Sequence, residues 1–156
     1  MAADIKPFSV SKLLSELVGR QVSTTLVPKS ADTKVKKAYG IYYGEPSKRA
    51  LVVIADVPLL ASFAGALLGL PDATAKERAM ETPMNEGVRD AIHEVLNIFS
   101  TVLAVEERVI FQKFVLDKVY CDGAAGKVLA EPTFTTPFNL SIAGGSEGRL
   151  TVLTTF

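Results

Sequence analysis

The sequence of 156 residues contains one cysteine and one histidine. Because a disulfide needs two cysteines and a cysteine-based metal cluster needs several, a single Cys121 excludes both within the chain. Cys121 follows an apolar strand-like segment, which favours a small buried hydrophobe over a nucleophile. The lone His93 excludes a multi-histidine metal site and leaves no basis for a Ser-His-Asp triad. We therefore expect no metal site in this chain.

The sequence also lacks an excess of either charge, since 17 Lys and Arg residues balance 17 Asp and Glu residues. A chain without a net field has no long-range attraction for nucleic acid or for an anionic membrane, so neither is an expected partner. The densest basic run, Lys34 to Lys37, is short and strand-like, which predicts a solvated edge. The run Asp122 to Lys127 contains two glycines before its lysine but lacks phosphate-loop spacing, and it is predicted to be a loop.

Long apolar runs are missing as well. The longest candidate, Leu51 to Leu70, is interrupted by Asp56 and Pro58, whereas a membrane span needs about 20 apolar residues. It predicts a strand followed by a buried helix, with Asp56 as the N-cap and Pro58 in the first turn. Met1 to Pro7 lack the basic start and apolar core of a signal peptide. These features predict a soluble cytoplasmic protein.

The remaining pattern predicts one α+β domain over residues 1–156. Helical periodicity marks Ser9–Val18, Leu59–Leu70 and Asn85–Glu106, and strand-like patterns mark Gln21–Val27, Ala38–Tyr43, Leu51–Ala55, Val109–Tyr120, Phe134–Ala143 and Leu150–Phe156. Gly44–Arg49 and Gly144–Gly148 have hairpin-turn composition, and the polar Asp72–Pro83 is predicted to connect two halves. This order loosely repeats one unit of a helix and antiparallel strands, with the helices packed on the sheet.

The segment from Asn85 to Glu106 is the most informative one, because it is strongly amphipathic. At about 100° per residue, its apolar residues form one stripe: Val88, Ile92, Val95, Leu96, Phe99, Val102 and Leu103. Asp90, Glu94, Asn97 and Thr101 fall on the opposite side. An asparagine in the middle of an exposed helical face is locally unfavourable, because its amide competes for backbone hydrogen bonds. Its position therefore suggests a role other than helix stability.

The run Asp90-Ala-Ile-His-Glu94-Val-Leu-Asn97 has the spacing D-x-x-x-E-x-x-N. It resembles the active-site helix of the CheC/CheX/FliY family of chemotaxis phosphatases. Three further similarities extend this resemblance over almost the whole chain: Pro7-Phe8 opening a helix that ends at Gly19, a strand and helix ending Leu-Gly-Leu-Pro71, and Pro137-Phe138 in a late strand. The single motif is most similar to the single-site CheX-like branch.

The resemblance implies a phosphatase that hydrolyses the aspartyl phosphate of a CheY-type response regulator in chemotaxis or two-component signalling. It implies that Asn97 orients the attacking water and that Glu94 contacts a lysine of the regulator, with Asp90 and Thr101 as partner-binding residues. Any Mg²⁺ would be held by the regulator, so no cofactor is expected in this chain. The CheX-like branch also implies a homodimer.

Two departures from the family pattern favour a different hypothesis. A glycine that is common four residues after the asparagine is replaced by Thr101, and a downstream proline is missing from Val109–Tyr120. The first helix has Glu16 followed three residues later by Gly19, so it carries no second site. The alternatives are a catalytically inactive CheX-like module that binds a signalling partner, or a structural homodimer whose acidic helix face is only solvated.

Overall fold

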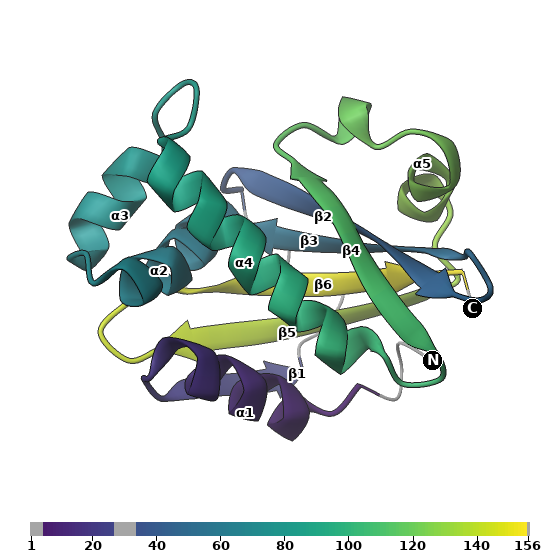
Figure 1. The fold of residues 1–156 in the computed structure, drawn as a ribbon, viewed down its shortest axis with the longest axis horizontal. Coiled ribbons are helices and arrows are strands. Elements are labelled where there is room, and N and C mark those ends of the chain that lie inside the picture. Colours follow the sequence, from purple (N-terminus) through teal and green to yellow (C-terminus); the bar gives the residue numbers. More distant parts are fainter. Residues whose placement is uncertain (1–4, 27–33, 156) are drawn as a thin grey trace.

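The computed structural model describes residues 5–26 and 34–155 of the chain. Within these ranges, one six-stranded antiparallel sheet carries helices on both of its faces (Figure 1). The predicted strand ends at Val27 and Phe156, and the N-terminal residues Met1 to Asp4, lie outside the described residues. Among the residues that the structure describes, no helix combines the length and apolar character needed to span a bilayer.

The order of the strands confirms the predicted repeat of two halves. In chain order the elements are α1 (Pro7–Val18), β1 (Val22–Leu26), β2 (Lys37–Glu45), β3 (Ala50–Asp56), α2 (Val57–Leu68), α3 (Asp72–Ala79), α4 (Glu86–Leu103), β4 (Arg108–Val115), the 3₁₀ turn η2 (Lys118–Tyr120), α5 (Gly123–Ala130), β5 (Phe134–Ile142) and β6 (Glu147–Thr154). The sheet order is β1-β5-β6-β3-β2-β4. Exchanging β1 with β4, β2 with β5 and β3 with β6 gives the same order read backwards. The two halves therefore meet at the central β3–β6 pair.

The larger core lies between the sheet and helices α1, α2 and α4 (Figure 1). Successive side chains of a strand point to opposite faces, so Leu51, Val53 and Ala55 of β3 enter this core. The helix α4 buries most of the predicted apolar stripe, namely Val88, Ile92, Val95, Leu96, Phe99 and Leu103, together with Ala91. The predicted Val102 is only partly buried. Each fully buried aliphatic or aromatic side chain of this kind stabilises the fold by roughly 1.5–3 kcal/mol. The helix is thus fixed on the sheet along its whole length.

The predicted loop from Asp122 to Lys127 is wrong, because Gly123–Ala130 form the helix α5. This helix packs on the sheet face opposite α4, where a second buried cluster contains Ile41, Ala50, Val52, Cys121, Ala125, Val128 and Leu153. A helix this short has little stability of its own, so its sequence carries a weak signal and its tertiary contacts decide its structure. The predicted burial of Cys121 is confirmed, and burial raises the pKa of its thiol.

The predicted connection from Asp72 to Pro83 is also wrong in part, because Asp72–Ala79 form the helix α3. Its buried side is limited to Ala75 and Ala79, which are four residues apart. The hydroxyl of Ser62 in α2 donates to Asp72 at 2.6 Å, and Lys76 pairs with the same carboxylate at 2.8 Å. Burial raises the pKa of Asp72, but the hydrogen bonds from Lys76 and Ser62 outweigh it and lower the pKa overall.

Several boundaries differ from the predicted ones. The strand predicted over Val109–Tyr120 ends at Val115, and its last residues form the turn η2. The helix predicted over Asn85–Glu106 begins with Asn85 as its N-cap and ends at Leu103. In α1 and α2 the predicted glycine stops are confirmed, since Gly19 and Gly69 adopt φ angles of 67° and 70°.

The junction of β3 and α2 contains a buried charge. Asp56 occupies the N-cap position as predicted, but its carboxylate makes no capping hydrogen bond. It instead accepts from the ammonium of Lys37 and from the backbone N–H of Arg149, the latter at 2.9 Å. Gly148 permits this approach, because a Cβ there would lie 2.9 Å from Cβ of Leu59 and 3.1 Å from the Asp56 carboxylate. Asp56 therefore joins β2, β3 and β6 instead of capping α2.

The predicted solvated edge at Lys34 to Lys37 is wrong for its last residue. Lys37 is the first residue of β2, which lies between β3 and β4 and is not an edge strand. Its side chain is only 16% exposed and pairs with Asp56. The basic run therefore contributes one cation to the interior of the sheet.

Candidate functional site

The outer face of α4 carries all the candidate residues that were predicted from the sequence. Asp90, Glu94, Asn97 and Thr101 are exposed, while the opposite side of the helix is buried. Residues three or four apart on a helix are neighbours on its surface, so the acid Glu94 stands one turn before the amide of Asn97. In Figure 1, α4 crosses the sheet diagonally with its outer side open to solvent. The structure thus brings the four residues together along one accessible ridge.

A buried tyrosine anchors the middle of this helix to the sheet. The hydroxyl of Tyr42 in β2 donates to the backbone carbonyl of Leu96 at 2.6 Å, next to Asn97 in the chain. Its ring packs against Phe111 of β4 with 5.1 Å between centroids. Burial raises the pKa of Tyr42 well above its usual range, so the phenol remains a donor. Sequence reasoning missed Tyr42, because alternation within a strand does not show what packs above it.

Tyr42→Phe is expected to lower the free energy of unfolding by about 1–2 kcal/mol, because it removes a buried hydrogen bond between the sheet and α4. Urea denaturation followed by circular dichroism measures this loss. Tyr43→Phe is the matched control, since Tyr43 lies on the other face of β2 and makes no hydrogen bond through its hydroxyl to the described residues. Equal stability of wild type and Tyr42→Phe would contradict the anchoring role.

Two further contacts flank the ridge. The exposed His93 meets the ring of Phe111 edge-on, with 4.8 Å between centroids, and the guanidinium of Arg89 lies 5.0 Å from the ring centre of Phe114. Both contacts tie α4 to β4. Within residues 5–26 and 34–155, no three His, Cys, Asp or Glu side chains gather as metal ligands. The chemistry available on the ridge is that of an acid and an amide.

A hollow beside the ridge adds an apolar element. It has a volume of about 320 Å³, lies between α1 and the last turns of α4, and is lined by Phe8, Ser9, Lys12, Leu13, Glu16, Thr101 and Val102. Phe8 stands at its rim with 74% of its surface exposed. In the repeat of the two halves α1 is the counterpart of α4, so the two related helices form this hollow together. The sequence indicated Phe8 only as part of a helix start.

Comparisons with known proteins place the fold. No family model and no curated protein matches the sequence. A chain of the FliG–FliM complex from H. pylori has a TM-score of 0.65 at 13% identity, covering 98% of this chain and 88% of that chain. FliY from Thermotoga maritima has a TM-score of 0.64 at 15% identity, covering 98% of this chain and 85% of that chain. A chain of the CheX–CheY–BeF3–Mg²⁺ complex from Borrelia burgdorferi has a TM-score of 0.56 at 11% identity, covering 96% of this chain and 97% of that chain. The chain has the CheX/FliY/FliM fold.

This fold confirms the resemblance that the helix motif indicated, over nearly the whole chain. The predicted α+β class, with helices packed on an antiparallel sheet, is confirmed with it. At identities of 11–15% the shared property is the fold, so the activity has to be argued from the ridge of α4. In this fold the residues of the D-x-x-x-E-x-x-N motif are exposed to solvent on α4, and Tyr42 anchors the inner side of that helix to the sheet.

Proposed function

We propose that the chain is a phosphatase for the aspartyl phosphate of a CheY-type response regulator in chemotaxis or two-component signalling. The observation that carries the proposal is the exposure of Glu94 and Asn97 one turn apart on a helix whose other side is buried. The fold supports it, because a structure of this fold has been solved as a CheX–CheY–BeF3–Mg²⁺ complex.

In this mechanism the amide of Asn97 enters the phosphorylation site of the regulator. Its oxygen accepts a hydrogen bond from the attacking water, and its N–H donates to a phosphoryl oxygen. Glu94 pairs with a lysine of the regulator and so fixes where the amide lies. The reaction needs in-line positioning more than covalent chemistry, and a helix fixed by Tyr42 gives that positioning. Any Mg²⁺ would be held by the regulator, where it would neutralise charge on the phosphoryl group.

The partner surface extends from the catalytic pair in both directions along α4. Asp90 stands one turn before Glu94, and Thr101 lines the hollow one turn after Asn97. The exposed Phe8 gives this surface an aromatic anchor, of the kind that dominates binding energies at protein interfaces. An apolar side chain of the regulator fits between Phe8 and Thr101 while its phosphorylation site faces Asn97.

Phe8→Ala is expected to weaken binding of a beryllofluoride-activated regulator about 5- to 30-fold, as loss of an aromatic anchor does. The free energy of unfolding should change by less than about 0.5 kcal/mol, because exposed positions contribute little to stability. Isothermal titration calorimetry measures the affinity. Val119→Ala is the control, since Val119 is 71% exposed in the turn η2, apart from the hollow. Unchanged affinity of Phe8→Ala would remove the hollow from the partner surface.

A second candidate is a catalytically inactive module that binds a signalling partner, alone or as a homodimer. Thr101 favours it, because its side chain narrows access beside Asn97 where the family commonly has glycine. Such a module keeps the ridge as a docking surface without the reaction.

The decay of a phosphorylated CheY-type regulator, with and without this protein, tests the first proposal. A phosphatase accelerates the loss of phosphate in proportion to its concentration, at a fixed concentration of Mg²⁺. Binding of the activated regulator is measured in parallel. Binding with an unchanged decay rate would overturn the phosphatase proposal and select the second candidate.

A further inference from the structure

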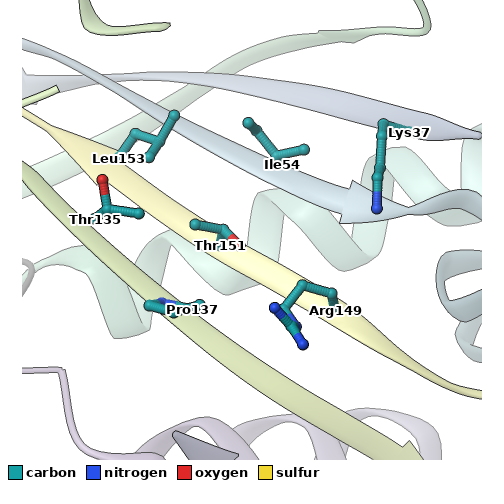
Figure 2. A pocket seen from close by; sticks show the side chains of 7 residues that line it. All are labelled: Lys37, Ile54, Thr135, Pro137, Arg149, Thr151 and Leu153. Atoms are coloured by element: carbon teal, nitrogen blue, oxygen red, sulfur yellow. The ribbon is translucent and has the colours of Figure 1, made fainter. Parts of the chain in front are cut away.

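The sheet face opposite α4 contains a hollow that the proposed phosphatase does not use. It has a volume of about 240 Å³ and is lined by Lys37, Ile54, Thr135, Pro137, Arg149, Thr151 and Leu153 from four neighbouring strands (Figure 2). Ile54 and Leu153 belong to or pack against the cluster under α5, which places the hollow on that face. The hollow lies beside α5, on a part of the sheet that this helix leaves open.

Three hydrogen-bonding groups in this hollow have no partner among the described residues. The hydroxyls of Thr135 and Thr151 make no hydrogen bond to any residue within 5–26 and 34–155. The Nε of Arg149 is buried and also has no partner there. Leaving such a donor buried and unpaired costs roughly 1–3 kcal/mol, and folded proteins rarely keep one without a reason. A bound acceptor beside Arg149 and Thr151, which are two residues apart on β6, would satisfy both of these groups.

The charges around the hollow favour an anion as that acceptor. Lys37 is neutralised by Asp56, whose second carboxylate oxygen takes the backbone N–H of Arg149. The guanidinium of Arg149 makes no ion pair with the described residues, so the lining keeps one uncompensated positive charge. Figure 2 shows Arg149 and Lys37 at one end of the hollow, with Thr151 between Arg149 and the apolar end at Leu153.

We propose that this hollow binds the phosphate or carboxylate group of a small molecule. The guanidinium of Arg149 presents a planar fork of donors that matches an oxyanion, and Thr151 on the same strand adds a hydroxyl donor. Thr135 lies at the other end of the hollow, opposite Leu153. Ile54, Pro137 and Leu153 form an apolar wall for the attached carbon skeleton. The volume is below the roughly 300–1,000 Å³ of pockets for drug-sized ligands, which limits the occupant to a small metabolite. This site is independent of the phosphatase proposal, because it lies on the other face of the sheet.

Titration of the ¹⁵N-labelled full chain with inorganic phosphate, and separately with acetate, tests the site by amide chemical shifts. Chloride keeps the ionic strength constant in both series. We expect saturable shifts in β5 and β6 around Arg149 and Thr151. Arg149→Gln should weaken binding at least about tenfold, and Thr151→Val roughly five- to tenfold, because each removes a donor to the anion. Arg108→Gln, at an exposed cation of β4, should bind like wild type.

The phosphate and acetate titrations distinguish the two kinds of ligand group that the site could bind. Tighter binding of phosphate assigns a phosphorylated metabolite, and tighter binding of acetate assigns a carboxylate. Valine at position 151 keeps the branched shape that a strand prefers, so this variant tests the site even if Arg149→Gln does not fold. Shifts that do not saturate, or equal affinities of wild type and Thr151→Val, would overturn the proposal.

Discussion

Asp56→Ala is expected to lower the free energy of unfolding by about 3–5 kcal/mol, as removal of one partner from a buried ion pair does. Asp56 is 3% exposed and accepts from both Lys37 and the backbone of Arg149. Without the carboxylate, the ammonium of Lys37 is left in a mostly buried position and the N–H of Arg149 loses its acceptor. The cost therefore comes from groups that stay behind, on two other strands.

Urea denaturation followed by circular dichroism measures this loss of stability. Two further variants show how much of the loss comes from the carboxylate charge and how much from the Lys37 ammonium. Asp56→Asn keeps an acceptor for the N–H of Arg149 but removes the charge, so a smaller loss of about 1–3 kcal/mol is expected. The double variant Asp56→Ala/Lys37→Met should recover part of the loss, because it also removes the ammonium that has lost the Asp56 carboxylate. Asp122→Ala is the control at an exposed acid without a side-chain capping bond. A loss below about 1 kcal/mol for Asp56→Ala would contradict the buried pair.

Local periodicity was enough to predict the elements that carry the fold. The helix α4 and the strands β2, β3, β5 and β6 are long, and their apolar residues recur at a fixed spacing. The short helices α3 and α5 were missed, because eight residues hold only a few buried positions. In α3 the buried positions are two alanines, one of which fits against Gly65 of α2. Such a helix is stabilised by its neighbours, which a local pattern does not contain.

The candidate site, too, could be predicted from the sequence only in part. The exposed face of α4 follows from the spacing of Asp90, Glu94 and Asn97, since positions on one helix are fixed by its geometry. The groups that support or extend the site come from distant parts of the chain. Tyr42 and Leu96, whose hydrogen bond anchors α4, are 54 residues apart. Outside this site, at the junction of β3 and α2, the bond between Asp56 and Arg149 spans 93 residues. Asp56 has the chemistry of an N-cap, and only the tertiary structure shows that its carboxylate is used elsewhere.

Asn97→Ala is expected to reduce the acceleration of regulator dephosphorylation at least about 100-fold, because loss of a positioning group can cost that much in rate. The decay of the phosphorylated regulator measures it, with Glu86→Ala as the control about three turns earlier on the same exposed face. Glu94→Ala should act more through affinity, by about 1.5–3 kcal/mol, since it removes the proposed charged contact to a lysine of the regulator.

Asn97→Ala is expected to separate the proposed catalysis from folding and binding. The side chain of Asn97 is exposed and makes no hydrogen bond to the described residues, so alanine should leave the fold intact and favour the helix slightly. Binding of the activated regulator should persist, because Asp90, Glu94 and the hollow at Phe8 are unchanged. Asn97→Asp tests the amide itself, since it keeps the shape but places a negative charge against the phosphoryl oxygens. Decay at the wild-type rate in Asn97→Ala would mean that any acceleration arises from docking alone, without the amide.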